Sequence, residues 1–121
     1  MGKILIAEDE KPMATALELK LKKAGFDAKA VFDGQNAIYA LENGHYDLLL
    51  LDLMMPGMDG FEVMKKIKEL NINVDIFVLS NLGQEEDKEK SLQAGAKDYF
   101  VKSNTPIVNI VEAVKKYFKN N

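Results

Sequence analysis

The chain has 121 residues, a formal net charge of −3 and no cysteine. This length suits a single domain with one sizeable core, and without cysteine neither a disulfide nor a thiolate metal centre can form. With His45 as the only histidine, a zinc centre or a histidine-dependent triad is not expected. All 16 basic residues are lysines and the charge is negative overall, whereas surfaces that bind nucleic acid are strongly basic. We therefore do not expect direct nucleic-acid binding.

No apolar run approaches the roughly 18 residues that a membrane-spanning helix needs, and the first residues lack the pattern of a signal peptide. We expect a cytoplasmic, monomeric protein that does not enter a membrane. The sequence shows no linker, low-complexity stretch or internal repeat, so we expect one domain over residues 1–121, with no output domain.

Short apolar runs alternate with helical patterns along the chain. Residues 3–7 form an apolar run that is followed by acids, which predicts a buried strand. Apolar residues then recur at helical spacing over 13–24, and Gly25 is a typical residue just after a helix. Residues 27–32 alternate as in a half-buried strand, and residues 35–43 are again helical.

The centre of the chain repeats this order. Residues 48–51 are all leucine and end at Asp52, as expected of a strand that is buried on both faces. Asp59 and Gly60 then lead into a third helix. Its inward-facing residues are predicted to be Phe61, Met64, Ile67 and Leu70.

The last third holds two more strand and helix pairs. Residues 76–79 predict a strand that ends at Ser80, and residues 85–94 predict a charged helix. Residues 99–101 predict a short strand that ends at Lys102. An amphipathic helix follows, with its apolar positions at Ile107, Ile110, Val111, Val114 and Phe118.

The start of this last helix has its own signals, since threonine can cap a helix and proline suits the first helical position. We expect Thr105 and Pro106 in these two roles. Five strands and five helices in strict alternation require a parallel sheet with helices on both faces. The fold class is therefore α/β and doubly wound, while periodicity leaves the strand order open.

Ligands of open α/β sheets bind beyond the carboxyl ends of the strands. Acidic residues follow the first strand (Glu8, Asp9) and the third (Asp52), while Ser80 ends the fourth and Lys102 the fifth. Each residue alone has a simpler interpretation, as a helix N-terminal charge, a turn residue or a solvated lysine. All of them fall at one edge of the sheet, however, and this favours a common site.

Ionised carboxylates at close range raise one another's pKa, and a hard divalent cation with oxygen ligands relieves the conflict. The acids at this edge therefore point to Mg²⁺. An aspartate that is supported by a cation, a lysine and a hydroxyl can attack phosphorus and form an acyl phosphate. The sequence thus indicates Mg²⁺-assisted phosphoryl chemistry.

Four segments carry a family resemblance: ILIAEDE, LLLLDLMMPGMDGFEV, FVLSN and AGAKDYFVKS. In this order and at these separations, the chain resembles the receiver domains of bacterial response regulators, of the chemotaxis-regulator (CheY-like) type, over essentially its whole length. The resemblance implies a flavodoxin-like (βα)5 fold with a five-stranded parallel sheet of order 2-1-3-4-5. It also implies a role in two-component (His-Asp) signal transduction.

The resemblance assigns roles residue by residue. Asp52 is the expected phosphoacceptor, Lys102 the lysine that pairs with the phosphoryl group, and Ser80 the hydroxyl that hydrogen-bonds it. Tyr99 is the expected switch aromatic, which turns inward as Ser80 moves. The Mg²⁺ ligands are expected to be Asp9, Asp52 and the backbone carbonyl of Met54, with Glu8 binding the ion through water.

The implied function is a switch. A histidine kinase or a phosphotransfer protein phosphorylates Asp52, and the face formed by the fourth helix, the fifth strand and the fifth helix changes its protein partners. The protein is not expected to be an enzyme, apart from catalysing its own phosphorylation and slow autodephosphorylation. The slow hydrolysis is predicted because Met54 and Leu82, two residues beyond Asp52 and Ser80, cannot activate water.

Three departures from the family pattern stand out. Ser103 replaces the usual cis-proline after the lysine, and a non-proline cis bond costs about 3 kcal/mol, which favours a trans peptide here. Asn81 replaces a commonly small residue, and the acidic pair is Glu-Asp rather than Asp-Asp. Val108 and Glu112 stand where receivers joined to winged-helix DNA binders often carry a dimer-forming Glu and Arg, so that subclass is disfavoured.

Two other classes of function remain as alternatives. A pseudo-receiver would bind partners without phosphate turnover, and Ser103 and Asn81 are its only support. An aspartate-nucleophile phosphatase would carry a second aspartate two residues after the nucleophile, where this chain has Met54.

Overall fold

The computed structural model describes residues 2–81 and 85–120. Its parallel strands form one sheet of order β2-β1-β3-β4-β5, as the family resemblance implied. The strands are β1 (Lys3–Ala7), β2 (Asp27–Val31), β3 (Leu48–Asp52), β4 (Asp75–Ser80) and β5 (Asp98–Val101). The predicted doubly wound, flavodoxin-like α/β fold is therefore confirmed.

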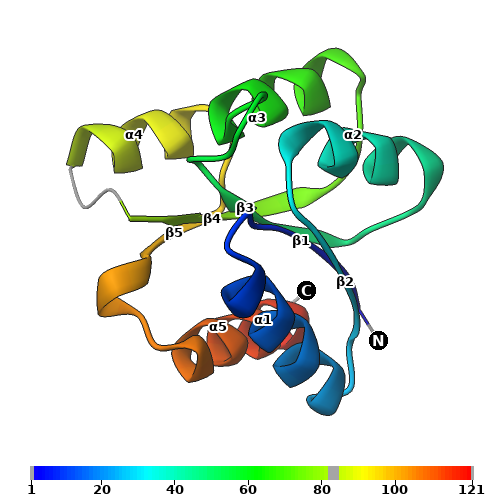
Figure 1. The fold of residues 1–121 in the computed structure, drawn as a ribbon, viewed down its shortest axis with the longest axis vertical. Coiled ribbons are helices and arrows are strands. Elements are labelled where there is room, and N and C mark those ends of the chain that lie inside the picture. The colour runs from blue at the N-terminus through cyan, green and yellow to red at the C-terminus, as the bar shows by residue number, and fades with distance from the viewer. Residues whose placement is uncertain (1, 82–84, 121) are drawn as a thin grey trace.

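Helices cover both faces of this sheet, and each connects two strands or follows the last one. They are α1 (Lys11–Lys23), α2 (Gly34–Asn43), α3 (Gly60–Glu69), α4 (Glu85–Gln93) and α5 (Ile107–Lys119). Figure 1 shows α2, α3 and α4 on one face and α1 with α5 on the other. A short 3-10 turn, Lys102–Asn104, joins β5 to the segment before α5. No helix in the described part of the chain is long and apolar enough to span a membrane.

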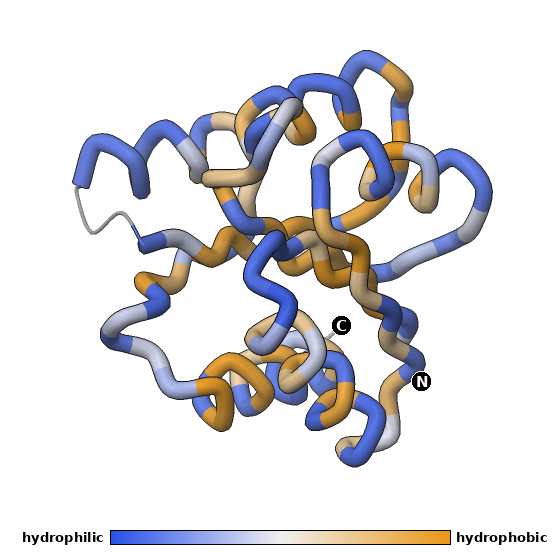
Figure 2. Tube along the Cα trace, in the orientation of Figure 1, coloured by the Kyte–Doolittle hydropathy of each residue, from blue (hydrophilic) through white to orange (hydrophobic). Residues whose placement is uncertain are grey.

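The leucine run of β3 divides the core into two layers. Leu49 and Leu51 pack with the apolar side chains of α2 and α3, and Leu48 and Leu50 pack with those of α1 and α5. Successive strand residues point to opposite faces, so a continuous leucine run serves both layers. Figure 2 shows the sheet as the apolar centre of the molecule, with polar segments outside it.

The helix boundaries confirm some sequence signals and correct others. Gly25 follows α1 with a left-handed φ of 99°, and Asp59 and Glu62 form a reciprocal capping box at the start of α3. The prediction that Thr105 caps the last helix is wrong. Pro106 occupies the N-cap position itself, with an extended ψ of 150°, and α5 begins one residue later.

The inward face of α3 also differs from the prediction. Met64 and Ile67 are buried as expected, but Leu70 is 44% exposed. Val63, which was not predicted to face inward, is fully buried. Leu70 is the C-cap of α3, where the helix ends. The helical spacing on which the prediction depended therefore does not apply to its side chain.

Candidate functional site

Four neighbouring strands end at one edge of the sheet and deliver the predicted polar residues there. In the parallel register, Ala7 pairs with Leu51, so Glu8 leaves β1 beside Asp52 at the end of β3. Ser80, the last residue of β4, pairs with Val101, and Lys102 follows directly. The strand ends therefore bring Glu8, Asp52 and Lys102 together, as expected from the sequence.

Three acidic residues meet at this edge. One carboxylate oxygen from each of Glu8, Asp9 and Asp52 lies within 4.8 Å of the other two. Glu8 is 0% and Asp52 2% exposed, while Asp9 faces solvent. The backbone N–H of Met54 donates to Asp52 Oδ1 at 3.1 Å, and the N–H of Glu10 donates to Glu8 Oε2 at 2.9 Å. Backbone groups thus fix both buried carboxylates.

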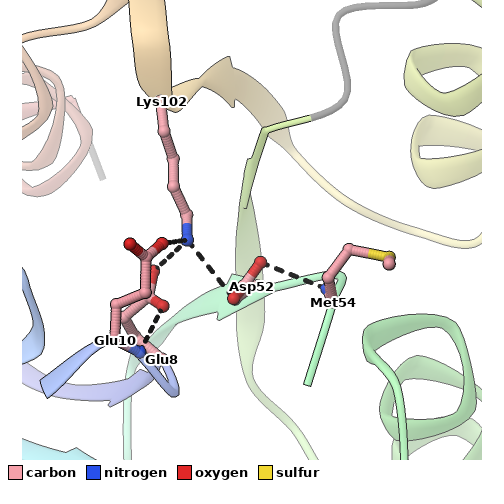
Figure 3. A network of polar contacts seen from close by, with 5 residues as sticks. All are labelled: Glu8, Glu10, Asp52, Met54 and Lys102. Atoms are coloured by element: carbon pink, nitrogen blue, oxygen red, sulfur yellow. Dashed lines mark hydrogen bonds and ion pairs between the residues drawn. The ribbon is translucent and has the colours of Figure 1, made fainter. Parts of the chain in front are cut away.

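The ammonium of Lys102 lies among the carboxylates of Glu8, Glu10 and Asp52, as Figure 3 shows. Its Nζ is 2.5 Å from Glu8 Oε1, 3.3 Å from Asp52 Oδ2 and 2.9 Å from Glu10 Oε1. The Lys102 side chain is only 6% exposed, and Ser103 follows it through a trans peptide, as the serine favours. The contact with Glu10 was not predicted. Its only signal in the sequence is that Glu10 is the third consecutive acidic residue after β1.

The charges of the site shift two pKa values. Burial and the neighbouring Glu8 carboxylate raise the pKa of Asp52 to about 7, against the opposing effects of the Met54 N–H and Lys102. Burial alone would lower the pKa of Lys102, but its contacts with Glu8, Glu10 and Asp52 raise it above the ordinary value. Lys102 is therefore fully protonated near neutral pH and only partly balances the acids.

The acids fit a divalent cation by their chemistry and their charge. Glu8 Oε1 is buried, and the Lys102 ammonium beside it is shared with Glu10 and Asp52, so one cation faces several carboxylates. Carboxylate oxygens that converge at one point, one of them exposed to solvent, suit Mg²⁺, which retains some of its waters. Ligation by these acids and by the Met54 carbonyl remains a prediction.

Both residues that were predicted to switch are buried, so the side chain of Tyr99 is already turned inward in this structure. Ser80 is fully buried at the end of β4, and Tyr99 is buried in β5 among the side chains of the α2 and α3 layer. Asn81 is exposed directly after Ser80. Leu82, which was expected to limit the access of water, lies outside the described residues.

Gly60 is a site residue that sequence reasoning treated only as a turn signal. A Cβ atom at this position would lie 2.7 Å from the Asp52 carbonyl oxygen and 2.8 Å from the Leu53 Cα. Both are backbone atoms that cannot move aside, so only glycine allows the first turn of α3 to approach the end of β3 this closely.

Comparisons with known proteins agree with this geometry. The family model of the response regulator receiver domain matches residues 4–115. The receiver domain of the Francisella response regulator 1452 is 30% identical, with a TM-score of 0.90, over 99% of this chain and 98% of that one.

Two further solved structures are similar. The response regulator TrrA from Thermotoga maritima, solved with Mg²⁺ and BeF, is 31% identical with a TM-score of 0.82, over 96% of this chain and 98% of that one. A DNA-binding response regulator of the LuxR family from Staphylococcus aureus is 26% identical with a TM-score of 0.86, over the same two shares.

Proposed function

Because the chain belongs to the family of response regulator receiver domains, we propose that it is a phosphorylatable switch in which Asp52 accepts the phosphoryl group. One observation carries the proposal. Asp52 is 2% exposed at a strand end, yet it faces two further carboxylates and one ammonium rather than apolar side chains. A purely structural residue would gain nothing from such surroundings, because burying clustered charges is costly.

The chain's own residues support in-line attack on phosphorus. The Met54 N–H holds one Asp52 oxygen, and the other oxygen, next to Lys102, is the nucleophile. The bond from this oxygen to phosphorus forms as the bond from phosphorus to the donor nitrogen breaks, and the imidazole of the kinase leaves with the electron pair. Mg²⁺, held by Glu8, Asp9, Asp52 and the Met54 carbonyl, would neutralise charge on the attacking and equatorial oxygens.

Lys102 and Ser80 then bind the new phosphoryl group. The ammonium of Lys102 lies 3.3 Å from the acceptor carboxylate, close enough to pair with an oxygen of the phosphoryl group on it. The Ser80 hydroxyl donates to another oxygen, and the buried Tyr99 on the neighbouring strand responds to its movement. We propose that the signal leaves through α4, β5 and α5, where Leu92 and Val108 are exposed.

Receiver domains interact with histidine kinases and downstream effectors, and we propose that partners of these two kinds serve this chain. We propose no turnover of external substrates, since Met54 cannot act as an acid or base at the position where aspartate phosphatases carry one. The same apolar side chain, 59% exposed beside the site, supports slow autodephosphorylation.

Intact-mass spectrometry after incubation with acetyl phosphate, with and without Mg²⁺, tests the proposal. We expect one phosphoryl addition that requires Mg²⁺ and is absent in Asp52→Asn. If no donor modifies the wild-type protein, a pseudo-receiver that binds partners unmodified becomes the better description. Addition to Asp52→Asn at the wild-type rate would assign the acceptor elsewhere.

A further inference from the structure

Glu10 occupies a position that helix formation does not explain. It is the N-cap of α1, but its side chain makes no capping hydrogen bond. Serine, threonine, aspartate and asparagine are preferred there because their short side chains reach the first backbone N–H groups. The Glu10 carboxylate instead accepts a hydrogen bond from Lys102 Nζ at 2.9 Å, from a residue 92 positions away. Its contact therefore belongs to the site.

The three carboxylates around Lys102 are not equivalent. Glu8 and Asp52 belong to the group of oxygens that can hold a metal, whereas Glu10 does not. Once a cation shares the charge of Glu8 and Asp52, Glu10 is the carboxylate that still competes for the ammonium. Glu10 is also half exposed, at 55% for its side chain, so it lies on the solvent side of the site, where an anionic donor arrives.

We propose that Glu10 is a positioning residue that acts through Lys102, favouring the metal cation and opposing the phosphoryl anion. This inference rests on the proposed function. The negative charge of Glu10 attracts a cation to the neighbouring acids. The same charge repels the incoming phosphoryl group and retains the ammonium that must pair with it.

This double role predicts two effects of opposite sign in Glu10→Gln. Glutamine has the same shape and can still accept the hydrogen bond from Lys102, but it removes the charge. Mg²⁺ should bind about 2- to 5-fold more weakly, as expected for loss of one exposed charge. At saturating Mg²⁺, beryllofluoride should bind, and acetyl phosphate should react, about 2- to 5-fold better. A structural defect would weaken all three processes together.

The experiment measures Mg²⁺ and beryllofluoride affinity by calorimetry and the rate of phosphoryl addition by intact mass. The matched control is Glu18→Gln, because Glu18 lies on the same helix and also accepts from a lysine, Lys22, at 2.9 Å. That control should leave all three quantities unchanged. The effects of Glu10→Gln should shrink at about 0.5 M salt, where exposed charges are screened.

Each outcome of this experiment either supports or overturns the inference. The crossed pattern in Glu10→Gln, with an unchanged Glu18→Gln, supports the inference. Unchanged constants, constants that weaken together, or an equal effect in Glu18→Gln would overturn it while leaving the proposed function intact. If the wild-type protein takes up no phosphoryl group, the proposed function fails and this inference fails with it.

Discussion

At the scale of single residues, the metal-free site holds buried carboxylates whose negative charges repel one another. Asp52 is the clearest case, since burial and Glu8 raise its pKa from 3.8 to about 7. Between these two values the folded state holds more protons than the unfolded chain. The contribution of Asp52 to stability therefore falls as the pH rises through this window.

The variant Asp52→Asn should consequently stabilise the metal-free protein, and more so at pH 8 than at pH 5. The expected gain at pH 8 is on the order of 1–4 kcal/mol, because one unit of pKa shift corresponds to about 1.4 kcal/mol and the rise of about three units sets the upper limit. Urea denaturation of both proteins at the two pH values, without Mg²⁺, measures it. A variant that is less stable than the wild type at pH 8 would contradict the electrostatic account.

Substitution of Lys102 should have the opposite effect on stability. In Lys102→Met, Glu8 and Asp52 stay buried without their ammonium partner, and breaking a buried ion pair costs about 3–5 kcal/mol. We expect a loss of this order in metal-free denaturation at pH 8, which Mg²⁺ partly restores. Lys22→Met, which breaks the exposed pair with Glu18, is the control and should cost about 1 kcal/mol or less. Equal losses in the two variants would show that Lys102 is not the counter-ion.

The residues of the site differ in how far sequence reasoning could reach them. Asp52 and Ser80 follow from the rule that strand ends meet at one edge, because a strand fixes where its last side chain lies, and Lys102 follows directly on β5. Glu10 does not follow, since it lies several residues beyond the end of β1 and its long side chain can reach in many directions. Its partner lies 92 positions away and was visible only in three dimensions.

At the scale of elements, α3 positions the acceptor through the close approach of Gly60 to β3. Gly60→Ala should lower stability by about 1–3 kcal/mol, as expected for overpacking against backbone. It should also reduce phosphoryl addition, because Asp52 is the residue displaced. Gly44→Ala is the control, since its added Cβ would meet neighbours at an ordinary 3.5 Å. Denaturation and intact mass compare the two, and a tolerated Gly60→Ala would disprove the steric argument.

Among the α-helices in the described part of the chain, α4 has the fewest buried residues. Ser91 is its only buried residue, and Lys90 above the ring of Phe61, 4.2 Å from the ring centroid, links it to α3. By contrast, every residue of β3 is buried. Weak burial lowers the free energy of local opening, so α4 is suited to reorganise when the site becomes charged.

Hydrogen exchange followed by NMR tests this contrast in the unphosphorylated protein. The amides of α4 should exchange at least about 100-fold faster than those of β3, corresponding to an opening free energy about 3 kcal/mol lower. The amides of α1, a helix with three buried apolar residues, serve as the reference. Protection of α4 equal to that of α1 would exclude α4 as the element that moves.

Sequence patterns predicted the helices and strands well, and the ends of the elements less well. Leu70 followed the helical spacing of α3, but the helix ends at Glu69 and the side chain turns to solvent. Likewise, threonine followed by proline is a common helix start, yet the extended backbone of Pro106 delays α5 by one residue. Backbone geometry at helix ends decides both cases, and periodicity does not encode it.

At the scale of the whole molecule, strict alternation of strands and helices was enough for the doubly wound class. It was not enough for the order of the strands, because several orders satisfy the same periodicity. The family segments supplied that order, and the register of β1 with β3 and of β3 with β4 agrees with them. This order brings Glu8 beside Asp52, and the proposed chemistry depends on it.

The most direct test of the account locates the phosphoryl group. Acyl phosphates are reduced by borohydride to alcohols, so treatment after phosphorylation with acetyl phosphate and Mg²⁺ marks the acceptor permanently for peptide mass spectrometry. We expect reduction at Asp52 alone, although Glu8 and Asp9 offer carboxylates within 4.8 Å of it. A mark on Glu8 or Asp9, or its absence from a protein that has gained phosphate, would contradict the central role of Asp52.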